Sequence, residues 1–154
     1  MIRLCWWSES EEQTLRFGES LGRALTGPVW VGLRGPLGAG KTRLIQGLAR
    51  GLGYDGPVRS PSYVLEHRYR GRLPILHLDL YRLEVPGPEL MASWEEDESA
   101  VVVVEWAERV AEPPPRAMRI DITPASAGRW IRMEWEARDG QLGDFHLEEF
   151  LRTP

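Results

Sequence analysis

The sequence contains 154 residues, with 19 basic and 23 acidic side chains and a formal net charge of −4 at pH 7. This acidic balance argues against a surface that binds nucleic acid non-specifically, because such surfaces carry an excess of Lys and Arg. The single cysteine, Cys5, excludes an intramolecular disulfide and a cysteine-rich zinc site. The chain shows no signal-peptide pattern and no apolar run long enough to span a bilayer. We therefore expect one cytoplasmic domain covering residues 1–154, with no membrane partner.

Apolar periodicity predicts two strand–helix units in the first third of the chain. The expected elements are strands at 2–7 and 29–33, and helices from about 8 to 25 and from 41 to about 52. Ser8 or Ser10 is placed to cap the first helix, and Glu11 stands at the right distance for a capping box with Ser8.

Glycines mark two features of these helices. Gly18 and Gly22 lie on the apolar face of the first helix, where they allow close packing. Gly51 and Gly53 follow the last apolar positions of the second helix, where glycine commonly ends a helix.

The rest of the chain predicts a hairpin, a short helix and further strands. The expected elements are strands at 63–69 and 73–78, a helix near 88–98, strands at 101–104, 118–122 and 129–136, and a closing helix at 145–151. The buried valine run and the strand–loop–helix units favour an α/β fold with a mixed, mainly parallel sheet. Antiparallel strands are expected at the hairpin and near the C-terminus.

The segment GPLGAGKT, residues 35–42, satisfies the phosphate-binding pattern G-x-x-x-x-G-K-[ST] between an apolar strand and a helix. Its Lys41 is the only lysine in the chain, and a compact ammonium suits a tight loop better than the broad guanidinium of Arg. The pattern predicts a P-loop NTPase-like three-layer sandwich that binds a nucleoside triphosphate. Lys41 is the expected catalytic contact to the terminal phosphates, and the Thr42 hydroxyl is an expected Mg²⁺ ligand. The expected nucleotide contacts in this segment are Gly35, Gly38, Ala39, Gly40, Lys41, Thr42 and Arg43.

Two carboxylates follow apolar strands, which is where a P-loop site needs an acid for Mg²⁺. Glu105 comes directly after four valines and is the preferred metal ligand. Asp79 is the candidate for an outer ligand or a water-positioning group. Trp106 must lie near the same strand end as Glu105. His77 is interpreted as a packing residue with no part in the chemistry.

Four segments together resemble one family. They are GPLGAGKT at 35–42, VRSPSYVL at 58–65, HLDLYRL at 77–83 and VVVVEWAE at 101–108. Their order and spacing resemble those of the TsaE family, also called YjeE, the P-loop ATPases of bacterial tRNA threonylcarbamoyladenosine synthesis. HLDLYRL is the most specific of the four, because a generic P-loop protein has no reason to contain it. The chain departs from the family pattern at Ser62, where Thr is usual, at Pro36, where an acidic residue is usual, and in MASWEEDE at 91–98, which lacks a typical glycine.

The resemblance implies an ATPase that works with the TsaD and TsaB proteins in threonylcarbamoyl transfer to adenosine 37 of tRNAs that read ANN codons. It implies ATP and Mg²⁺ as cofactors, and contact with tRNA only through the complex. By the same resemblance, Thr42 and Glu105 would hold Mg²⁺ and Asp79 would be needed for hydrolysis. Residues 60–62 would form a switch-like loop, and Arg129 would lie near the nucleotide.

Two other classes of protein are compatible with the P-loop. A small-molecule kinase would fit the chain length, and Arg68, Arg70 and Arg72 could form its phosphate-clamping lid or a local basic groove. A nucleotide-binding module without useful turnover would leave Asp79 and Glu105 idle. The sequence shows no acceptor pocket for a kinase and no basic excess suited to holding tRNA unaided. We therefore favour an ATPase that is weak alone and depends on partners.

Overall fold

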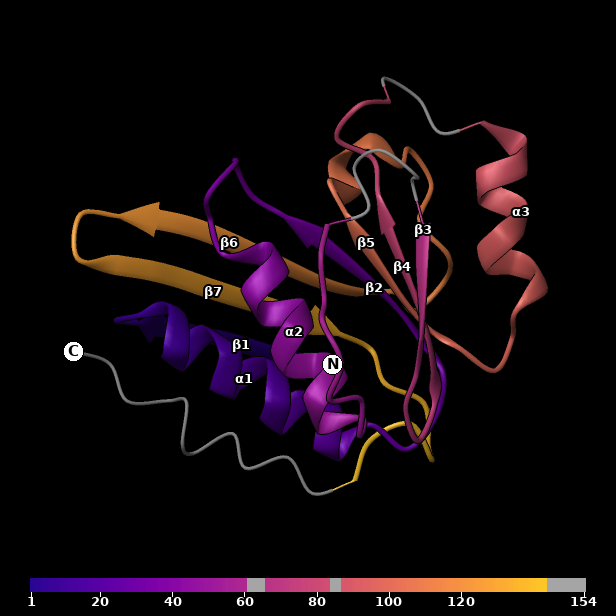
Figure 1. The fold of residues 1–154 in the computed structure, drawn as a ribbon, viewed down its shortest axis with the longest axis horizontal. Coiled ribbons are helices and arrows are strands. Elements are labelled where there is room, and N and C mark those ends of the chain that lie inside the picture. The colour runs from indigo at the N-terminus through magenta and orange to yellow at the C-terminus, as the bar shows by residue number, and fades with distance from the viewer. Residues whose placement is uncertain (61–65, 84–86, 144–154) are drawn as a thin grey trace.

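The computed structural model describes residues 1–60, 66–83 and 87–143, which form seven strands and three α-helices (Figure 1). In chain order the elements are β1 Ile2–Ser8, α1 Glu11–Ala24, β2 Val29–Arg34, α2 Lys41–Gly51, β3 Glu66–Arg70, β4 Pro74–Asp79, α3 Pro88–Glu96, β5 Val101–Glu105, the 3₁₀ turn η1 Ala107–Arg109, β6 Met118–Ala125 and β7 Gly128–Trp135. The expected helix at 145–151 and the expected strand start at 63–65 lie outside the described residues. None of the described helices is long and apolar enough to cross a membrane.

The strands form one mixed sheet in the order β1-β7-β6-β2-β5-β4-β3. The centre of the sheet is parallel, since β2 pairs with β5 and β6 in this sense and β4 pairs with β5. Antiparallel pairs lie on both sides, at the β3–β4 hairpin and between β6 and β7, as the sequence predicted. The first strand, β1, adds a third antiparallel pair with β7. The two kinds of pair are therefore equal in number among the described strands.

Helices cover the two faces of this sheet unequally (Figure 1). On one face α1 and α2 close the main hydrophobic core, in which Phe17 and Leu48 are fully buried. On the other face α3 and η1 cover β2, β4 and β5, and Trp94 of α3 packs edge-on against Trp30 of β2 with ring centroids 5.7 Å apart. The three-layer arrangement is therefore complete over the half of the sheet that includes β2, β5 and β4.

The other half of the sheet has one exposed face. The side chains that β1, β6 and β7 direct away from α1 and α2 include Arg3, Arg119 and Arg132, all of them exposed. Their inward neighbours are buried, which is the alternation of an antiparallel sheet with one face in water. The alternation predicted for 130–135 is confirmed, since Ile131 and Met133 are fully buried.

The helices α1 and α2 touch backbone to backbone through glycines. A Cβ atom on Gly47 would lie 2.0 Å from the carbonyl oxygen of Leu15, and one on Gly18 would lie 2.2 Å from that of Leu44. The glycines on this contact are Gly18, Gly22, Gly47 and Gly51. Because α2 begins at Lys41, this contact fixes the helix that follows the phosphate-binding segment.

The ends of the helices differ in detail from the sequence prediction. Ser10 caps α1 by accepting from the backbone N–H of Gln13 at 3.1 Å, so the predicted capping box between Glu11 and Ser8 is wrong. Oε1 of Gln13 accepts from the N–H of Glu9, the residue before the N-cap, at 2.9 Å. Gly53, with φ +91°, follows the end of α2, whereas Gly51 is the last residue within the helix.

Candidate functional site

The segment 35–42 connects β2 to α2 in a conformation that only glycine adopts easily. Gly35, Gly38 and Gly40 have φ values of +152°, +77° and +106°. A Cβ atom on Gly35 would lie 2.6 Å from the carbonyl oxygen of Ile122, so this position also lacks space for a side chain. The loop therefore passes close to β6 before it turns into α2.

The N-terminus of α2 is open to an anion. Its N-cap is Gly40, which makes no side-chain capping bond, whereas α1 is capped by Ser10. The first backbone N–H groups of a helix have no partner within the helix, and the helix dipole favours negative charge at this end. The geometry thus fits the phosphate cradle that the sequence predicted.

Lys41 points back over this loop. Its Nζ donates to the carbonyl oxygens of Gly35 and, at 3.2 Å, of Pro36, and it lies 4.1 Å from the ring centroid of Trp106. The side chain is only 6% exposed, and this burial lowers the pKa of the ammonium, against the charge of Glu105, which raises it. These partners are weak substitutes for an anion, so phosphate oxygens are better partners for this ammonium.

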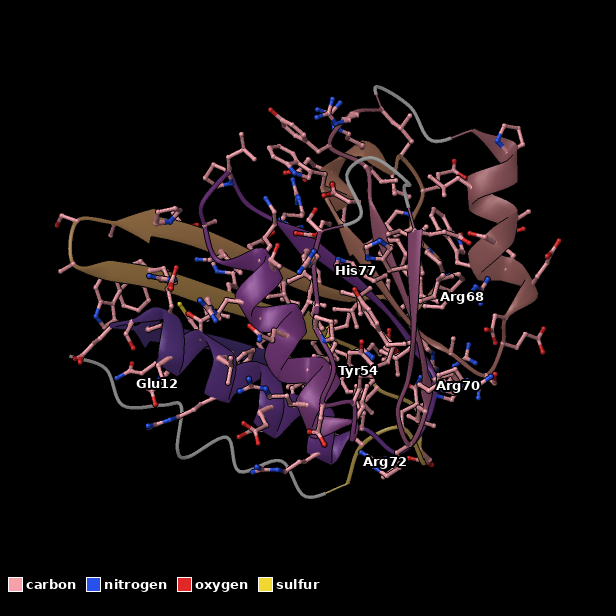
Figure 2. The ribbon with its side chains drawn as sticks, viewed as in Figure 1. Glu12, Tyr54, Arg68, Arg70, Arg72 and His77 are labelled. Atoms are coloured by element: carbon pink, nitrogen blue, oxygen red, sulfur yellow. The ribbon has the colours of Figure 1, made fainter. Side chains whose placement is uncertain are left out.

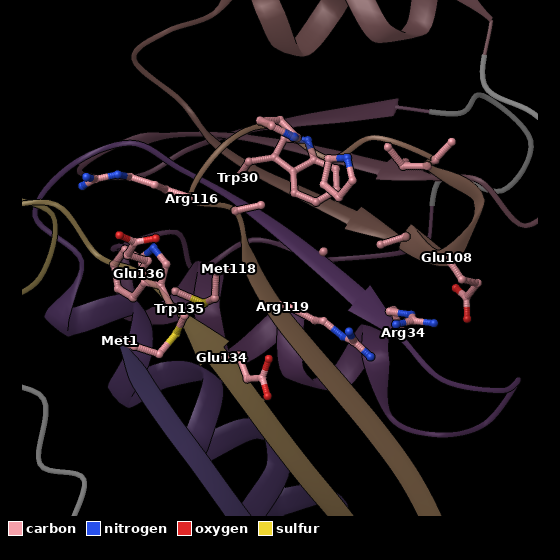
Figure 3. A pocket seen from close by; sticks show the side chains of 17 residues that line it. Met1, Trp30, Arg34, Glu108, Arg116, Met118, Arg119, Glu134, Trp135 and Glu136 are labelled. Atoms are coloured by element: carbon pink, nitrogen blue, oxygen red, sulfur yellow. The ribbon is translucent and has the colours of Figure 1, made fainter.

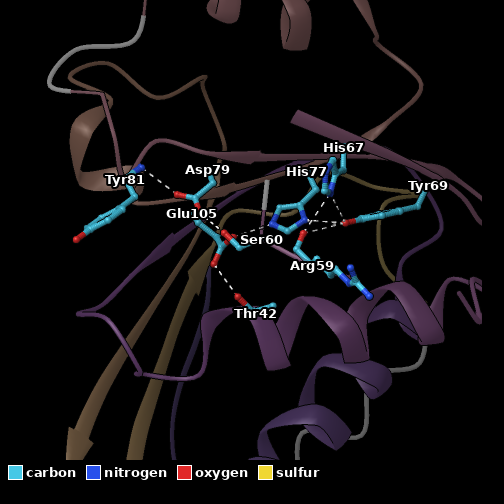
Figure 4. Close-up of polar contacts among 9 residues, drawn as sticks. All are labelled: Thr42, Arg59, Ser60, His67, Tyr69, His77, Asp79, Tyr81 and Glu105. Atoms are coloured by element: carbon cyan, nitrogen blue, oxygen red, sulfur yellow. Dashed lines mark hydrogen bonds and ion pairs between the residues drawn. The ribbon is translucent and has the colours of Figure 1, made fainter. Parts of the chain in front are cut away.

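The two expected carboxylates lie side by side at the ends of neighbouring parallel strands. Asp79 and Glu105 are register partners on β4 and β5, and each is 3% exposed. Oε1 of Glu105 accepts from the hydroxyl of Thr42 at 3.1 Å (Figure 4). Asp79 accepts from the N–H of Tyr81 at 2.9 Å through Oδ1 and from the hydroxyl of Ser60 through Oδ2. The parallel pairing thus brings both acids to the start of α2.

The oxygen atoms at this point suit Mg²⁺. A hydroxyl and a carboxylate are the hard ligands that this ion prefers, with the remaining positions left to phosphates and water. No group of three or more His, Cys, Asp or Glu side chains in the described ranges could hold a metal by itself.

A cavity of about 500 Å³ opens beside these groups. Its walls come from the first turn of α1, the loop, the start of α2 and the ends of β4 and β5, and they include Glu11, Lys41, Thr42, Asp79, Glu105 and Trp106. Glu11 pairs with Arg43 across this space at 3.2 Å. Arg129 lies beside the loop, since a Cβ atom on Gly40 would be 3.0 Å from its Nη1. The structure therefore brings the predicted site residues together, and their roles stay predictions.

Trp106 lies where the sequence placed it, directly after Glu105. Its backbone is left-handed, with φ 60° and ψ 44°, and its ring packs against that of Tyr81 at 5.1 Å between centroids. This turn directs the indole across the cavity toward Lys41.

One residue of the site was missed from the sequence. His77 was interpreted as a packing residue, and it is fully buried, but its Nε2 lies 2.8 Å from Oε2 of Glu105. Its Nδ1 lies 3.1 Å from the hydroxyl of Tyr69 (Figure 4). The sequence did contain an indication of this position. His77 and Asp79 are two residues apart on one strand, so their side chains lie on the same face of the sheet.

Arg68, Arg70 and Arg72, which were considered for a kinase lid, do not line the cavity beside residues 35–42 (Figure 2). Arg72 donates to the carbonyl oxygens of Leu25 and Gly22, each at 2.8 Å, and so caps the C-terminal end of α1. Arg68 contacts Asp97 at 3.3 Å, and Arg70 pairs with Pro74, at the opposite end of β4 from Asp79. This removes the structural support for the kinase alternative.

A second cavity, of about 530 Å³, has a lining separate from the phosphate-binding segment (Figure 3). Its walls include Trp30, Arg34, Arg119 and Glu134 and none of residues 35–42. It therefore belongs to a different part of the surface from the site described above.

Comparison with known proteins agrees with this geometry. Residues 8–132 match the family described as "Threonylcarbamoyl adenosine biosynthesis protein TsaE". The chain belongs to the TsaE family. Two TsaE relatives carry the name tRNA threonylcarbamoyladenosine biosynthesis protein TsaE. That of a Nostoc strain is 41% identical over 77% of this chain and 76% of its own length, and that of Aquifex aeolicus is 40% identical over 66% and 74%.

The fold also matches a solved structure. The crystal structure of Bacillus subtilis YdiB superposes with a TM-score of 0.71 at 26% sequence identity, over 88% of this chain and 87% of that one. The α/β fold with a mixed sheet is thereby confirmed.

Proposed function

We propose that this TsaE-family chain binds ATP with Mg²⁺ at residues 35–42 and hydrolyses it in support of tRNA threonylcarbamoyladenosine synthesis. The names of the relatives support the pathway. The observation that carries the chemistry is the 3.1 Å contact between Thr42 and Glu105 at the uncapped start of α2. It joins a metal-ligating hydroxyl to a strand-end acid within reach of the phosphate cradle.

The phosphates would be held by the loop and by Lys41. The proposed nucleotide contacts are Gly35, Gly38, Ala39, Gly40, Lys41, Thr42, Arg43 and Arg129. Lys41 would exchange its carbonyl partners for phosphate oxygens and stabilise the charge that develops on them during transfer. Burial strengthens this effect, because water screens the ammonium less.

The two acids would have separate tasks. Thr42 and Glu105 would ligate Mg²⁺, which when bound neutralises charge on the phosphate oxygens. Asp79 would orient the attacking water, because its carboxylate is fixed by Tyr81 and Ser60 beside the metal ligand. Ser60 is the first residue of the segment that the resemblance assigns to a switch-like loop, and residues 61 and 62 of that segment lie outside the described residues.

The proposed setting is a cytoplasmic complex with TsaD and TsaB. The chain has a net charge of −4, so we propose that tRNA is contacted through the complex and not by this chain alone. A single ATPase domain of this kind turns over slowly until a partner completes its site.

Reconstitution tests the proposal. Threonylcarbamoyl transfer to tRNA is measured with TsaD and TsaB, with and without this chain, and ATP hydrolysis is measured in parallel. We expect multiple-turnover product formation and hydrolysis to need the chain and to be lost with Lys41→Ala. Arg50→Ala, which removes an exposed cation in the last turn of the same helix, is the matched control and should act as wild type. A reaction that proceeds equally well without the chain, or with Lys41→Ala, contradicts the proposal. ATP consumption in proportion to an added hydroxyl acceptor would instead indicate a kinase.

A further inference from the structure

The two carboxylate oxygens of Glu105 have different partners. Oε1 faces the hydroxyl of Thr42 at 3.1 Å, and Oε2 faces Nε2 of His77 at 2.8 Å (Figure 4). An ionised carboxylate can only accept, so Nε2 of His77 must donate. With one oxygen held by His77, the carboxylate cannot rotate freely, and the other oxygen stays directed at Thr42.

Tyr69 fixes His77 from the opposite side of the imidazole. Its hydroxyl lies 3.1 Å from Nδ1 of His77, in a region where His77 is fully buried and Tyr69 is 7% exposed. Burial raises the pKa of Tyr69 to about 12, so the hydroxyl keeps its single proton. Both Nδ1 of His77 and the carbonyl oxygen of Arg59 can accept this proton, and the contact with Nδ1 is the shorter, at 3.1 Å against 3.4 Å. A neutral imidazole that donates from Nε2 has its acceptor at Nδ1, which matches this arrangement.

Tyr69 is itself held in place. Its ring packs against that of Tyr54 in a tilted arrangement, with 4.8 Å between centroids and 30° between the planes, and its hydroxyl lies 3.4 Å from the carbonyl oxygen of Arg59. The order of contacts is therefore Thr42, Glu105, His77 and Tyr69, with each side chain fixed by the next. Nothing in this row except Thr42 and Glu105 is placed to touch the nucleotide or the metal.

We propose that His77 is a positioning residue for the magnesium ligand Glu105, and that Tyr69 sets the orientation of His77 for this task. The proposal rests on the proposed function, because it concerns the Mg²⁺ site of that function. A carboxylate already held in its ligating orientation loses less freedom when it binds the ion. Changing such a partner of a metal ligand costs about 10- to 100-fold in metal affinity in other proteins.

The test measures how much Mg²⁺ strengthens ATP binding. The magnesium enhancement is the dissociation constant of ATP in EDTA divided by that in Mg²⁺, both from titration calorimetry on the full chain. In His77→Asn the amide is too short to reach Glu105, and we expect the enhancement to fall about tenfold. In His77→Gln the amide nitrogen can take the place of Nε2, and we expect most of the enhancement to remain. ATP binding in EDTA should stay as in wild type in both variants.

Tyr69→Phe provides an independent arm that keeps His77. Removing the Tyr69 hydroxyl should lower the magnesium enhancement about threefold when His77 is present, because His77 then loses one hydrogen bond. It should have no effect in the His77→Gln background, because Gln has no atom at the Nδ1 position. Arg70→Gln is the matched control: Arg70 follows Tyr69 on β3, its side chain is exposed, and it pairs with Pro74 at the opposite end of β4 from Asp79, so the enhancement should not change.

The outcomes separate the two proposals. An unchanged enhancement in His77→Asn, or an equal effect of Tyr69→Phe in both backgrounds, overturns the positioning role while the nucleotide site stands. Equal weakening in EDTA and Mg²⁺ also overturns it, because it indicates general damage to the site. If His77→Asn does not fold, as judged by circular dichroism, the Tyr69→Phe pair decides. Failure of the wild type to bind ATP in either buffer overturns the proposed function, and this inference with it.

Discussion

Gly47→Ala should destabilise the protein although it replaces glycine by the best helix former. The new Cβ would lie 2.0 Å from the carbonyl oxygen of Leu15 and 2.9 Å from the backbone nitrogen of Glu19. Both atoms belong to the backbone of α1, so no side-chain rotation can make room. The helices must separate, and the packing of Phe17 and Leu48 at their contact would loosen with them.

The magnitude follows from two opposing effects. Gly→Ala in a helix interior is favourable by up to about 1 kcal/mol, whereas overpacking a tight contact costs about 1–3 kcal/mol and occasionally more. Because the clash here is with backbone on both sides, we expect the upper part of that range and a net loss of about 2 kcal/mol. For a chain of this size the loss corresponds to a fall in melting temperature of roughly 4–8 °C.

The assay is thermal and urea unfolding followed by circular dichroism. Gly87→Ala is the matched control, because a Cβ there would meet nothing within 4 Å and its φ of −75° accepts alanine. Because Gly87 is the N-cap of α3, where alanine is less favourable than glycine, we expect this control to lose no more than about 1 kcal/mol. A Gly47→Ala variant as stable as wild type, or more stable, would refute the backbone-to-backbone contact of α1 and α2.

Three further outcomes are expected. Lys41→Arg should impair ATP hydrolysis about as severely as Lys41→Ala, because the guanidinium does not fit the loop; near-normal hydrolysis would contradict the steric argument. Glu105→Gln should weaken the Mg²⁺ dependence of ATP binding, whereas Asp79→Asn should keep binding and slow turnover; the reverse pattern in calorimetry and kinetics would exchange their roles. Because burial raises the pKa of Tyr69 to about 12, its phenolate absorbance should be missing near pH 10, where exposed tyrosines ionise. Its protonated form is favoured by folding, so this contribution to stability is complete below pH 10 and is lost as the pH rises toward about 12. The measurement is the difference between the alkaline titrations of wild type and Tyr69→Phe, and a step near pH 10 would show an exposed hydroxyl.

The sequence predicted correctly those elements whose structure depends mainly on residues within the same segment. Three such predictions are confirmed: the glycine-rich loop, the buried valine strand and the alternation at 130–135. Each depends only on hydrophobic periodicity and on glycines within a few neighbouring residues. The contact between the carboxyl ends of β4 and β5 was also predictable, since parallel strands that follow apolar runs place their terminal acids at one edge.

What the sequence did not reveal depends on pairs of residues from different elements. The role of His77 depends on which side chain faces it from β5, and burial alone is the same for a packing histidine and a positioning one. Gly51 resembles a helix stop, yet it serves the contact with α1, where a Cβ would lie 2.2 Å from the carbonyl oxygen of Glu19. The sequence was compatible with either Ser8 or Ser10 as the cap. Ser8 is the last residue of β1, where it pairs with Arg129, and Ser10 caps α1.

At Trp106 the stability of the fold and the shape of the site favour different residues. It is one of only two non-glycine residues with positive φ in the described ranges, and such a conformation costs a residue with a Cβ about 1–2 kcal/mol. Glycine or asparagine would suit the backbone better, but either would remove the ring that lies over Lys41. A redesign guided by stability alone would therefore select this tryptophan for replacement. The protein it produced would tolerate heat better and would have lost one wall of the cavity beside residues 35–42.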